Sequence, residues 1–384
     1  MRPRTLLLAG LLALPTLEMP ARAAAAPSGA VEANLGRVSA GGQFACAVAT
    51  DGTPACWGDN TFGESTLPAD LGTNPTISAG NYNTACAIRA DGTPVCWGFA
   101  TGYGAIPGDI TTVKAIAMGL FHACAIKPDD TVACWGGNWH HQTDVPADLG
   151  RVVALSSSGY HTCAIQETGT PVCWGHNTSG QLTIPGDITT VKAISAGSDH
   201  TCAIKPDDTL ACWGNDNDSN GDPAGQATVP GDLGAVKAVS AGGNHTCVIR
   251  ADGTPFCWGE NLYGQSDVPT GIGRVLAIDG GATQTCAIKT DGSLVCWGEN
   301  THGESAVPGG YGTWSARPTA PVSARSPQTP RPIRLRACAA PPGTTRRSPS
   351  TRARTAPGRS SRRAAQPSSP APGSPSRSPS ARRR

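Results

Sequence analysis

The sequence predicts an all-β chain that forms a seven-bladed β-propeller from short repeats of about 39 residues. Three observations support this fold class. Two cysteines ten positions apart, the second in a Cys-Trp-Gly triplet, recur seven times. Apolar and polar residues alternate on both sides of a short turn between them, which is the period of a half-buried strand. No amphipathic helical segment competes with the strands.

The clearest repeat is His200–Gly214, which reads HTCAIKPDDTLACWG. Successive second cysteines are 40, 38, 39, 39, 45 and 39 residues apart, so the repeats form a tandem array with one insertion. One unit holds three or four short strands and cannot bury both faces alone, so neighbouring units must stack. Seven small sheets around an axis make a closed propeller with only short edges.

The turn between the cysteines predicts one cross-strand disulfide per blade. A three-residue hairpin loop needs a left-handed residue at its last position, where Gly52 and its counterparts stand, with Asp130 and Asp208 in two repeats. This register puts the two cysteines opposite each other, within disulfide reach. Zinc is the weaker interpretation, because a ten-residue separation does not gather four ligands. The predicted pairs are Cys46 with Cys56, Cys86 with Cys96, Cys124 with Cys134, Cys163 with Cys173, Cys202 with Cys212, Cys247 with Cys257 and Cys286 with Cys296.

Two other recurring residues favour structural roles. The Trp of each triplet recurs in every unit, which predicts packing between neighbouring blades. Four repeats carry a His two residues before the first cysteine, and these His lie on different blades. They therefore predict hydrogen bonds to a neighbouring strand in preference to one shared metal or substrate site. The four are His122, His161, His200 and His245.

The ends of the chain differ from the array. Residues 1–25 resemble a secretory signal, with Arg2 and Arg4 before an apolar run and a small-residue cleavage site after it. The apolar run is too short for a membrane span. Export agrees with paired cysteines, so we expect a secreted protein that is extracellular, periplasmic or held at the cell surface. Residues 26–34 form a short lead, and 35–316 the propeller.

The composition changes near Thr313. All 28 Asp and Glu and only 14 of the 30 Lys and Arg precede it, a net charge of −14. The other 16 basic residues are Arg in segment 317–384, which is rich in Pro and Ser and contains the unpaired Cys338. Such a segment predicts disorder. The segment has two interpretations: it results from a shifted reading frame, or it is a basic tail that binds acidic surfaces.

The longest interval contains the insertion Asn215–Gly225. Within it, the spacing of four acidic or amide side chains matches the start of a calcium loop, namely Asp216, Asp218, Asn220 and Asp222. The twelfth position is Ala227 instead of a bidentate Glu, so a complete EF-hand loop is absent. A turn-forming, solvated insertion is the alternative. Calcium is the one cofactor that the sequence suggests.

The repeat AG-x-x-HTCAI-x-x-DGT-x-x-CWG-x-N-x-x-GQ-x-x-VP resembles that of the regulator of chromosome condensation family, and the resemblance covers all seven repeats. It implies a seven-bladed propeller. The short period and the Val-Pro return are similar to the secreted bacterial branch, which includes the second β-lactamase inhibitory protein. That inhibitor carries aromatics in the same loops, whereas here repeats five and seven have Ser198, Asp199, Ala282 and Thr283.

Binding is the expected function, since no motif of catalysis is present and we predict no enzyme. The loops before each second strand and after each Cys-Trp-Gly triplet should share one face of the propeller. Large aromatics in these loops gather in repeats one to four and are candidate partner-binding residues. They are Phe44, Phe62, Tyr82, Phe99, Tyr103, Phe121, Trp139 and Tyr160.

Three functions fit these loops. The first is a secreted monomer that binds an extracellular protein, as an enzyme inhibitor or an adhesion module. The second is a carbohydrate- or matrix-binding propeller. The third, implied by the family's nuclear member, is guanine-nucleotide exchange, which the signal peptide and disulfides disfavour. Nucleic acid is excluded as a partner because an acidic ring is repelled by phosphate backbones.

Overall fold

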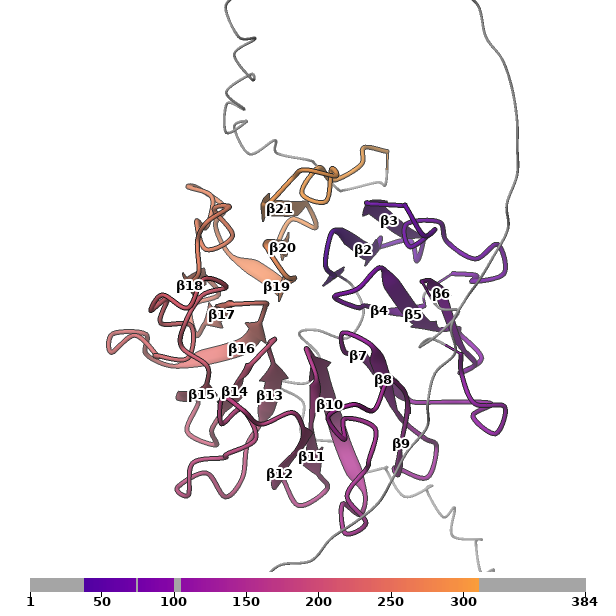
Figure 1. The fold of residues 1–384 in the computed structure, drawn as a ribbon. Helices are drawn as coiled ribbons and strands as arrows, with labels where there is room; N and C mark the ends of the chain where they lie inside the picture. Colours follow the sequence, from indigo (N-terminus) through magenta and orange to yellow (C-terminus); the bar gives the residue numbers. More distant parts are fainter. Residues whose placement is uncertain (1–37, 74, 100–104, 311–384) are drawn as a thin grey trace, which may run out of the picture. The chain divides into compact units, whose positions relative to one another are not determined.

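Seven separate antiparallel sheets make up the computed structural model, which describes residues 38–73, 75–99 and 105–310. Each sheet has three strands in consecutive order, and we number the sheets as blades 1 to 7. Figure 1 shows the blades following one another around a common centre, with β19–β21 next to β1–β3. The signal-sequence, lead and tail predictions (1–25, 26–34 and 317–384) lie outside the described residues.

The strands have equivalent places in every blade. The first strands are β1 (Val38–Ala40), β4 (Thr76–Ala79), β7 (Ala115–Met118), β10 (Val152–Ser158), β13 (Ala193–Ala196), β16 (Val236–Ala241) and β19 (Val275–Gly280). The second strands are β2 (Phe44–Val48), β5 (Thr84–Ile88), β8 (His122–Ile126), β11 (His161–Gln166), β14 (His200–Ile204), β17 (His245–Arg250) and β20 (Gln284–Lys289). The third strands are β3 (Pro54–Gly58), β6 (Pro94–Gly98), β9 (Val132–Gly136), β12 (Pro171–Gly175), β15 (Leu210–Gly214), β18 (Pro255–Gly259) and β21 (Leu294–Gly298).

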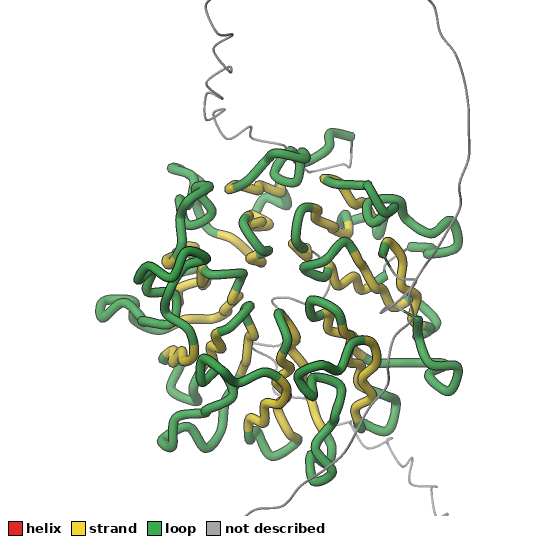
Figure 2. Tube along the Cα trace, in the orientation of Figure 1, coloured by secondary structure: helices red, strands yellow, loops and turns green. Residues whose placement is uncertain are grey.

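Loops connect the strands throughout the described part of the chain (Figure 2). None of the described residues belongs to a helix long and apolar enough to cross a membrane.

The disulfide prediction is confirmed in all seven blades. The two cysteines of each blade face each other across the second and third strands, with Cα atoms 4.0–4.1 Å apart. The bonded pairs are Cys46 with Cys56, Cys86 with Cys96, Cys124 with Cys134, Cys163 with Cys173, Cys202 with Cys212, Cys247 with Cys257 and Cys286 with Cys296. Seven disulfides favour an oxidising environment.

The two cysteines differ in burial in most blades. Every second-strand cysteine is fully buried. The third-strand cysteines are buried in blades 6 and 7, at Cys257 and Cys296, and partly buried in the other five, which are Cys56, Cys96, Cys134, Cys173 and Cys212. The third strand is the outer edge of each sheet, so the bridges tie that edge to the buried middle strand.

The turn between the bonded strands has the predicted left-handed residue. Gly52 has φ 89°, and Asp130 and Asp208 each have φ 67°. The hairpin loop therefore sets the register that places the cysteines opposite each other.

The hydrophobic core lies between neighbouring blades, as the recurring Trp predicts. One cluster joins Ile165 of blade 4 to Ala203 and Trp213 of blade 5. The indole Nε1 of Trp213 donates to the carbonyl of Gln181, which lies in the return loop of blade 4. The same bond to the preceding blade is made by Trp57, Trp97, Trp174 and Trp297.

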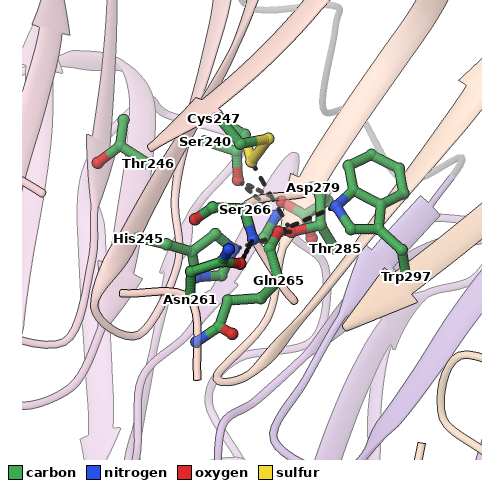
Figure 3. The surroundings of a disulfide bond; sticks show 12 residues. Ser240, His245, Thr246, Cys247, Asn261, Gln265, Ser266, Asp279, Thr285 and Trp297 are labelled. Carbon is green, nitrogen blue, oxygen red and sulfur yellow. Dashed lines mark hydrogen bonds between the residues drawn. A yellow bond between two sulfur atoms is a disulfide. The ribbon is translucent and has the colours of Figure 1, made fainter. Parts of the chain in front are cut away.

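The four His form a second set of bonds between blades, in agreement with the sequence prediction. In blades 3 to 6 the His Nε2 lies 2.8–2.9 Å from a Thr hydroxyl of the next blade. The hydroxyl of Thr285 donates to the carbonyl of Gln265, so its oxygen accepts from His245 and Nε2 carries the proton. Figure 3 shows this arrangement beside the Cys247 disulfide, with Trp297 directed at the same Gln265 carbonyl.

The first strands surround a cavity of about 520 Å³. In most blades, one side-chain oxygen from the first strand accepts the backbone N–H of the following blade. These oxygens belong to Ser39, Ser78, Ser156, Ser195, Ser240 and Asp279. Asp279 joins blade 7 to Ala40 of blade 1 and also accepts from Ser240. The first and last blades are therefore joined in the same way as the others.

Candidate binding surface

The aromatic residues are positioned by two short segments of each blade. One is the corner between the first and second strands, and the other is the return loop that begins after the Cys-Trp-Gly triplet. A backbone bond ties them together in every blade, as between Phe99 N and the Asn83 carbonyl, or His176 N and the Tyr160 carbonyl. Corners of neighbouring blades also bond to each other, as Leu120 N does to the Gly159 carbonyl. All these segments therefore share one side, which we call the loop face.

The close approach of the corners depends on glycine. A Cβ on Gly197 would lie 2.3 Å from the His200 ring and 2.7 Å from the carbonyl of Gly242 in the next blade. Both distances are shorter than a side chain tolerates, so packing requires glycine at this corner. The corner side chains of successive blades are thereby brought near one another.

Eight rings form a continuous chain of contacts on the loop face, from blade 1 to blade 4. Phe99 packs against Phe62 and Tyr82, with ring centroids 4.9 and 5.6 Å apart. Phe121 lies 4.7 Å from Tyr82, 5.5 Å from Trp139 and 6.0 Å from Tyr160. We call the set the aromatic band: Phe62, Tyr82, Phe99, Phe121, Trp139, His140, Tyr160 and His176.

Much of the aromatic band is open to solvent. Trp139 is 59% exposed, Phe62 45% and Tyr82 40%, while Phe99, Phe121 and Tyr160 are partly buried beneath and between them. A depression beside Tyr82, Phe99 and Phe121 measures only about 10 Å³, room for about one water molecule. The surface is shallow there, which suits contact with another surface better than enclosure of a small molecule.

Six of the eight predicted partner-binding residues meet in this band, and the other two do not. Tyr103 lies outside the described residues. Phe44 is fully buried, so its prediction as a contact residue is wrong. It is the first residue of β2 and occupies the place that His takes in blades 3 to 6. In blade 1, Phe44 belongs to the hydrophobic cluster that contains Ala85 of blade 2. In blades 3 to 6, the two equivalent places hold a His and the Thr of the next blade to which that His is bonded.

Two members of the band were missed by the sequence interpretation. His140 packs between Tyr160 and His176, with centroids 4.9 and 4.5 Å away. The signal was present, because His140 follows Trp139 and His176 directly follows the Cys-Trp-Gly triplet of blade 4. Tyr263 is 48% exposed and belongs to the loop face of blade 6, apart from the band in sequence and blade.

The band ends at Asp199 in the corner of blade 5. One Asp199 oxygen lies 3.4 Å from His176 Nδ1 and accepts a 2.9 Å hydrogen bond from Gln181 Nε2. Burial, and then the negative charge of Asp199, raise the pKa of Tyr160. The Asp199 side chain is 37% exposed, so an outside group can still reach it.

Two of the four residues in the calcium prediction accept backbone hydrogen bonds in the turns of the insertion. Asp216 Oδ1 accepts from the backbone of Ala227 and Thr228, and Asp218 Oδ1 from Asn220 and Asp222. Within 38–73, 75–99 and 105–310, no group of three or more His, Cys, Asp or Glu is gathered as a metal site. Calcium binding stays a prediction.

Comparison with known proteins agrees with this fold. Six segments match the regulator of chromosome condensation (RCC1) repeat, at residues 37–64, 113–142, 152–181, 191–221, 236–265 and 275–304. No curated protein sequence matches the chain at a significant level.

Several solved structures share the architecture. The ectodomain of the receptor kinase CR4 from Physcomitrella patens is 23% identical, with TM-score 0.57 over 69% of this chain and 74% of that one. The CRINKLY WD40 ectodomain of ACR4 from Arabidopsis thaliana is 24% identical, with TM-score 0.55 over 69% of this chain and 97% of that one. Prp20p from Saccharomyces cerevisiae is 16% identical, with TM-score 0.51 over 64% of this chain and 80% of that one. The chain is therefore a disulfide-bonded propeller in which six of the seven blades match the RCC1 repeat.

Proposed function

We propose that the protein is a secreted, non-enzymatic binding propeller that docks a protein partner on the aromatic band of its loop face. The observation that carries this proposal is the unbroken ring contact from Phe62 to His176. The symmetry of the repeats does not require it, because blades 5 to 7 have the same backbone without it. Large aromatic side chains at a partly desolvated surface are typical anchors of protein interfaces.

Enzyme inhibition and adhesion are the two roles that suit such a module. The band is held in place, since three of its rings stand on corners that are bonded to neighbouring blades, and the return loops that carry the other rings are bonded to the corners of their own blades. A rigid aromatic surface loses little conformational entropy on binding. The resemblance to a secreted inhibitor family and the seven disulfides support an extracellular setting.

The test is affinity capture from the native secretome with the full chain as bait. The variant Tyr82→Ala/Trp139→Ala removes two exposed band side chains, and we expect it to lose the captured partner with an unchanged melting temperature. Leu276→Ala is the matched control, because it removes a 60% exposed apolar side chain from a first strand. Equal capture by the wild type and the band variant would refute the proposal.

Carbohydrate binding is a second candidate, favoured by the 59% exposure of Trp139. A flat indole can stack against a sugar ring as well as against a protein side chain. A glycan array separates the two functions, because a carbohydrate binder would retain defined glycans and lose them in Trp139→Ala, whereas a protein binder would retain none.

A further inference from the structure

The charged residues of the described propeller are divided unequally between its two faces. We call the end that carries the turns between second and third strands the hairpin face. Every Lys and Arg within the described residues lies in one of these turns or beside it, at the start of a first strand. They are Arg89, Lys114, Lys127, Arg151, Lys192, Lys205, Lys237, Arg250, Arg274 and Lys289.

Several of these cations are already paired on the hairpin face. Lys114 and Arg151 both contact Asp130, and Lys192 contacts Asp208. Arg89 forms an ion pair with Asp70 and Lys289 with Asp291. The hairpin face therefore balances much of its own negative charge.

The loop face has carboxylates and, among the described residues, no Lys or Arg. Its acids belong to the corners and return loops: Asp59, Glu64, Asp144, Asp199, Asp216, Asp218, Asp222, Glu260, Asp267, Glu299 and Glu304. Glu64 and Glu304 are buried beneath their loops. The others leave the described loop face negative next to an apolar band, and charge complementarity then has to come from the partner.

Asp199 is the place where the negative charge meets the band. It stands beside Tyr160 and His176 and is more than a third exposed. A cation that approached it would face a carboxylate and an aromatic ring together. Aromatic faces attract Lys and Arg, so the two attractions reinforce each other.

We propose that the partner of the loop face is a protein segment in which large apolar side chains lie next to Lys or Arg. The apolar side chains cover the aromatic band, and a cation binds at Asp199. This inference rests on the proposed function and adds the chemistry of the partner. An anionic glycan would be repelled by the same carboxylates.

The experiment uses two synthetic peptides with identical Leu and Trp positions. One carries Arg and Lys at the intervening positions, and the other carries Glu. Binding of each to the full chain is measured by fluorescence anisotropy at low and at physiological salt. We expect the basic peptide to bind at least about tenfold more tightly than the acidic one, and to weaken as salt is added.

Point variants separate a specific site from the general attraction of an acidic protein for a basic peptide. Asp199→Asn should weaken the basic peptide about two- to fivefold, the range for an exposed ion pair. Asp187→Asn is the matched control, since it removes the same charge from an exposed turn that leads into the next first strand, and it should change nothing. Tyr82→Ala should weaken both peptides.

Three results would overturn the inference: equal or tighter binding of the acidic peptide, equal effects of Asp199→Asn and Asp187→Asn, or no binding of either peptide. None of these would refute the proposed function, which depends on capture of a partner by the aromatic band. Equal capture of the partner by the wild type and by Tyr82→Ala/Trp139→Ala would instead refute the proposed function itself.

Discussion

The indole Nε1 of Trp213 donates a 2.9 Å hydrogen bond to the backbone carbonyl of Gln181 in the preceding blade. The hydroxyl of Thr201 donates to the same oxygen, also at 2.9 Å. One return-loop carbonyl thus receives two donors from the next blade. This joint links the loop face to the core, because Gln181 also holds Asp199 through its side chain.

Replacing Trp213 by Phe should reduce the free energy of unfolding by about 1–3 kcal/mol. The substitution removes the indole donor and leaves a small void between blades 4 and 5, but the carbonyl keeps its bond from Thr201. Urea unfolding followed by circular dichroism measures the loss. Trp139→Phe is the control, since Trp139 is largely exposed and its replacement should cost less than about 0.5 kcal/mol; equal losses would contradict the interpretation.

The buried His predict loss of stability in mild acid. Burial lowers the pKa of His200 from 6.5 to about 4. The unfolded chain therefore takes up a proton near pH 6.5, whereas the folded chain does so only near pH 4. Stability is highest above pH 6.5 and falls as the pH decreases toward 4.

His200→Gln should make this decline shallower, by about 3 kcal/mol over the interval. Gln is the matched choice because Gln284 fills the same place in blade 7 and donates to the Gly41 carbonyl. Unfolding free energies at about pH 7, 5.5 and 4.5 give the slope. An unchanged slope would mean that His200 is already protonated in the folded state or solvated in it.

Asp279 predicts the opposite pH dependence. Burial raises its pKa from 3.8 to about 6, so the folded state holds a proton that the unfolded state has released. Stability from this group is lost as the pH rises from about 4 to about 6 and stays lower above that. Asp279→Asn should therefore gain stability relative to the wild type between about pH 4.5 and pH 7.5, by an amount on the order of 2–3 kcal/mol.

The control for Asp279 is Asp187→Asn, which removes a carboxylate from an exposed turn and should cost less than about 0.5 kcal/mol. Guanidinium unfolding at the two pH values suffices. If the free energy of unfolding of Asp279→Asn instead fell further below that of the wild type as the pH rose, the ionised carboxylate would be the form that stabilises the joint to Ala40.

Each disulfide should contribute on the order of 2–3 kcal/mol, the value for a short loop in the chain-entropy account. The double variant Cys202→Ala and Cys212→Ala tests this in the blade with the insertion, where both cysteines lie in the hairpin of β14 and β15. Thermal unfolding under oxidising conditions gives the loss. In reductant, the wild type should melt at a lower temperature than the variant does under oxidising conditions, because the reductant opens seven bridges whereas the variant lacks one. No loss in the variant would assign the stability to blade packing alone.

Local features of this fold were predictable because they depend on neighbours in sequence. The pairing of Cys202 with Cys212 follows from the turn between them, and Gly52 has its left-handed backbone because the hairpin loop requires it. The aromatic band was predictable only in outline. Phe44 was misplaced because its burial depends on Ala85 of the next blade, about forty residues along the chain.

The sequence pattern also could not show that His140 and His176 belong to the aromatic band. Their membership of the aromatic band depends on the distance between blades 3 and 4, which the pattern within one repeat does not contain. The repeat length allows three or four strands per blade, and the structure has three.

The way in which blade 7 meets blade 1 has a genetic consequence. Each sheet is made from one continuous stretch of chain, and the joint from Asp279 to Ala40 resembles the joints between the other blades. No strand is exchanged between the two ends of the described array. A gene rearranged to start at any other blade would therefore encode the same ring, and duplication or deletion of a whole repeat would change the circumference without inventing a new kind of contact.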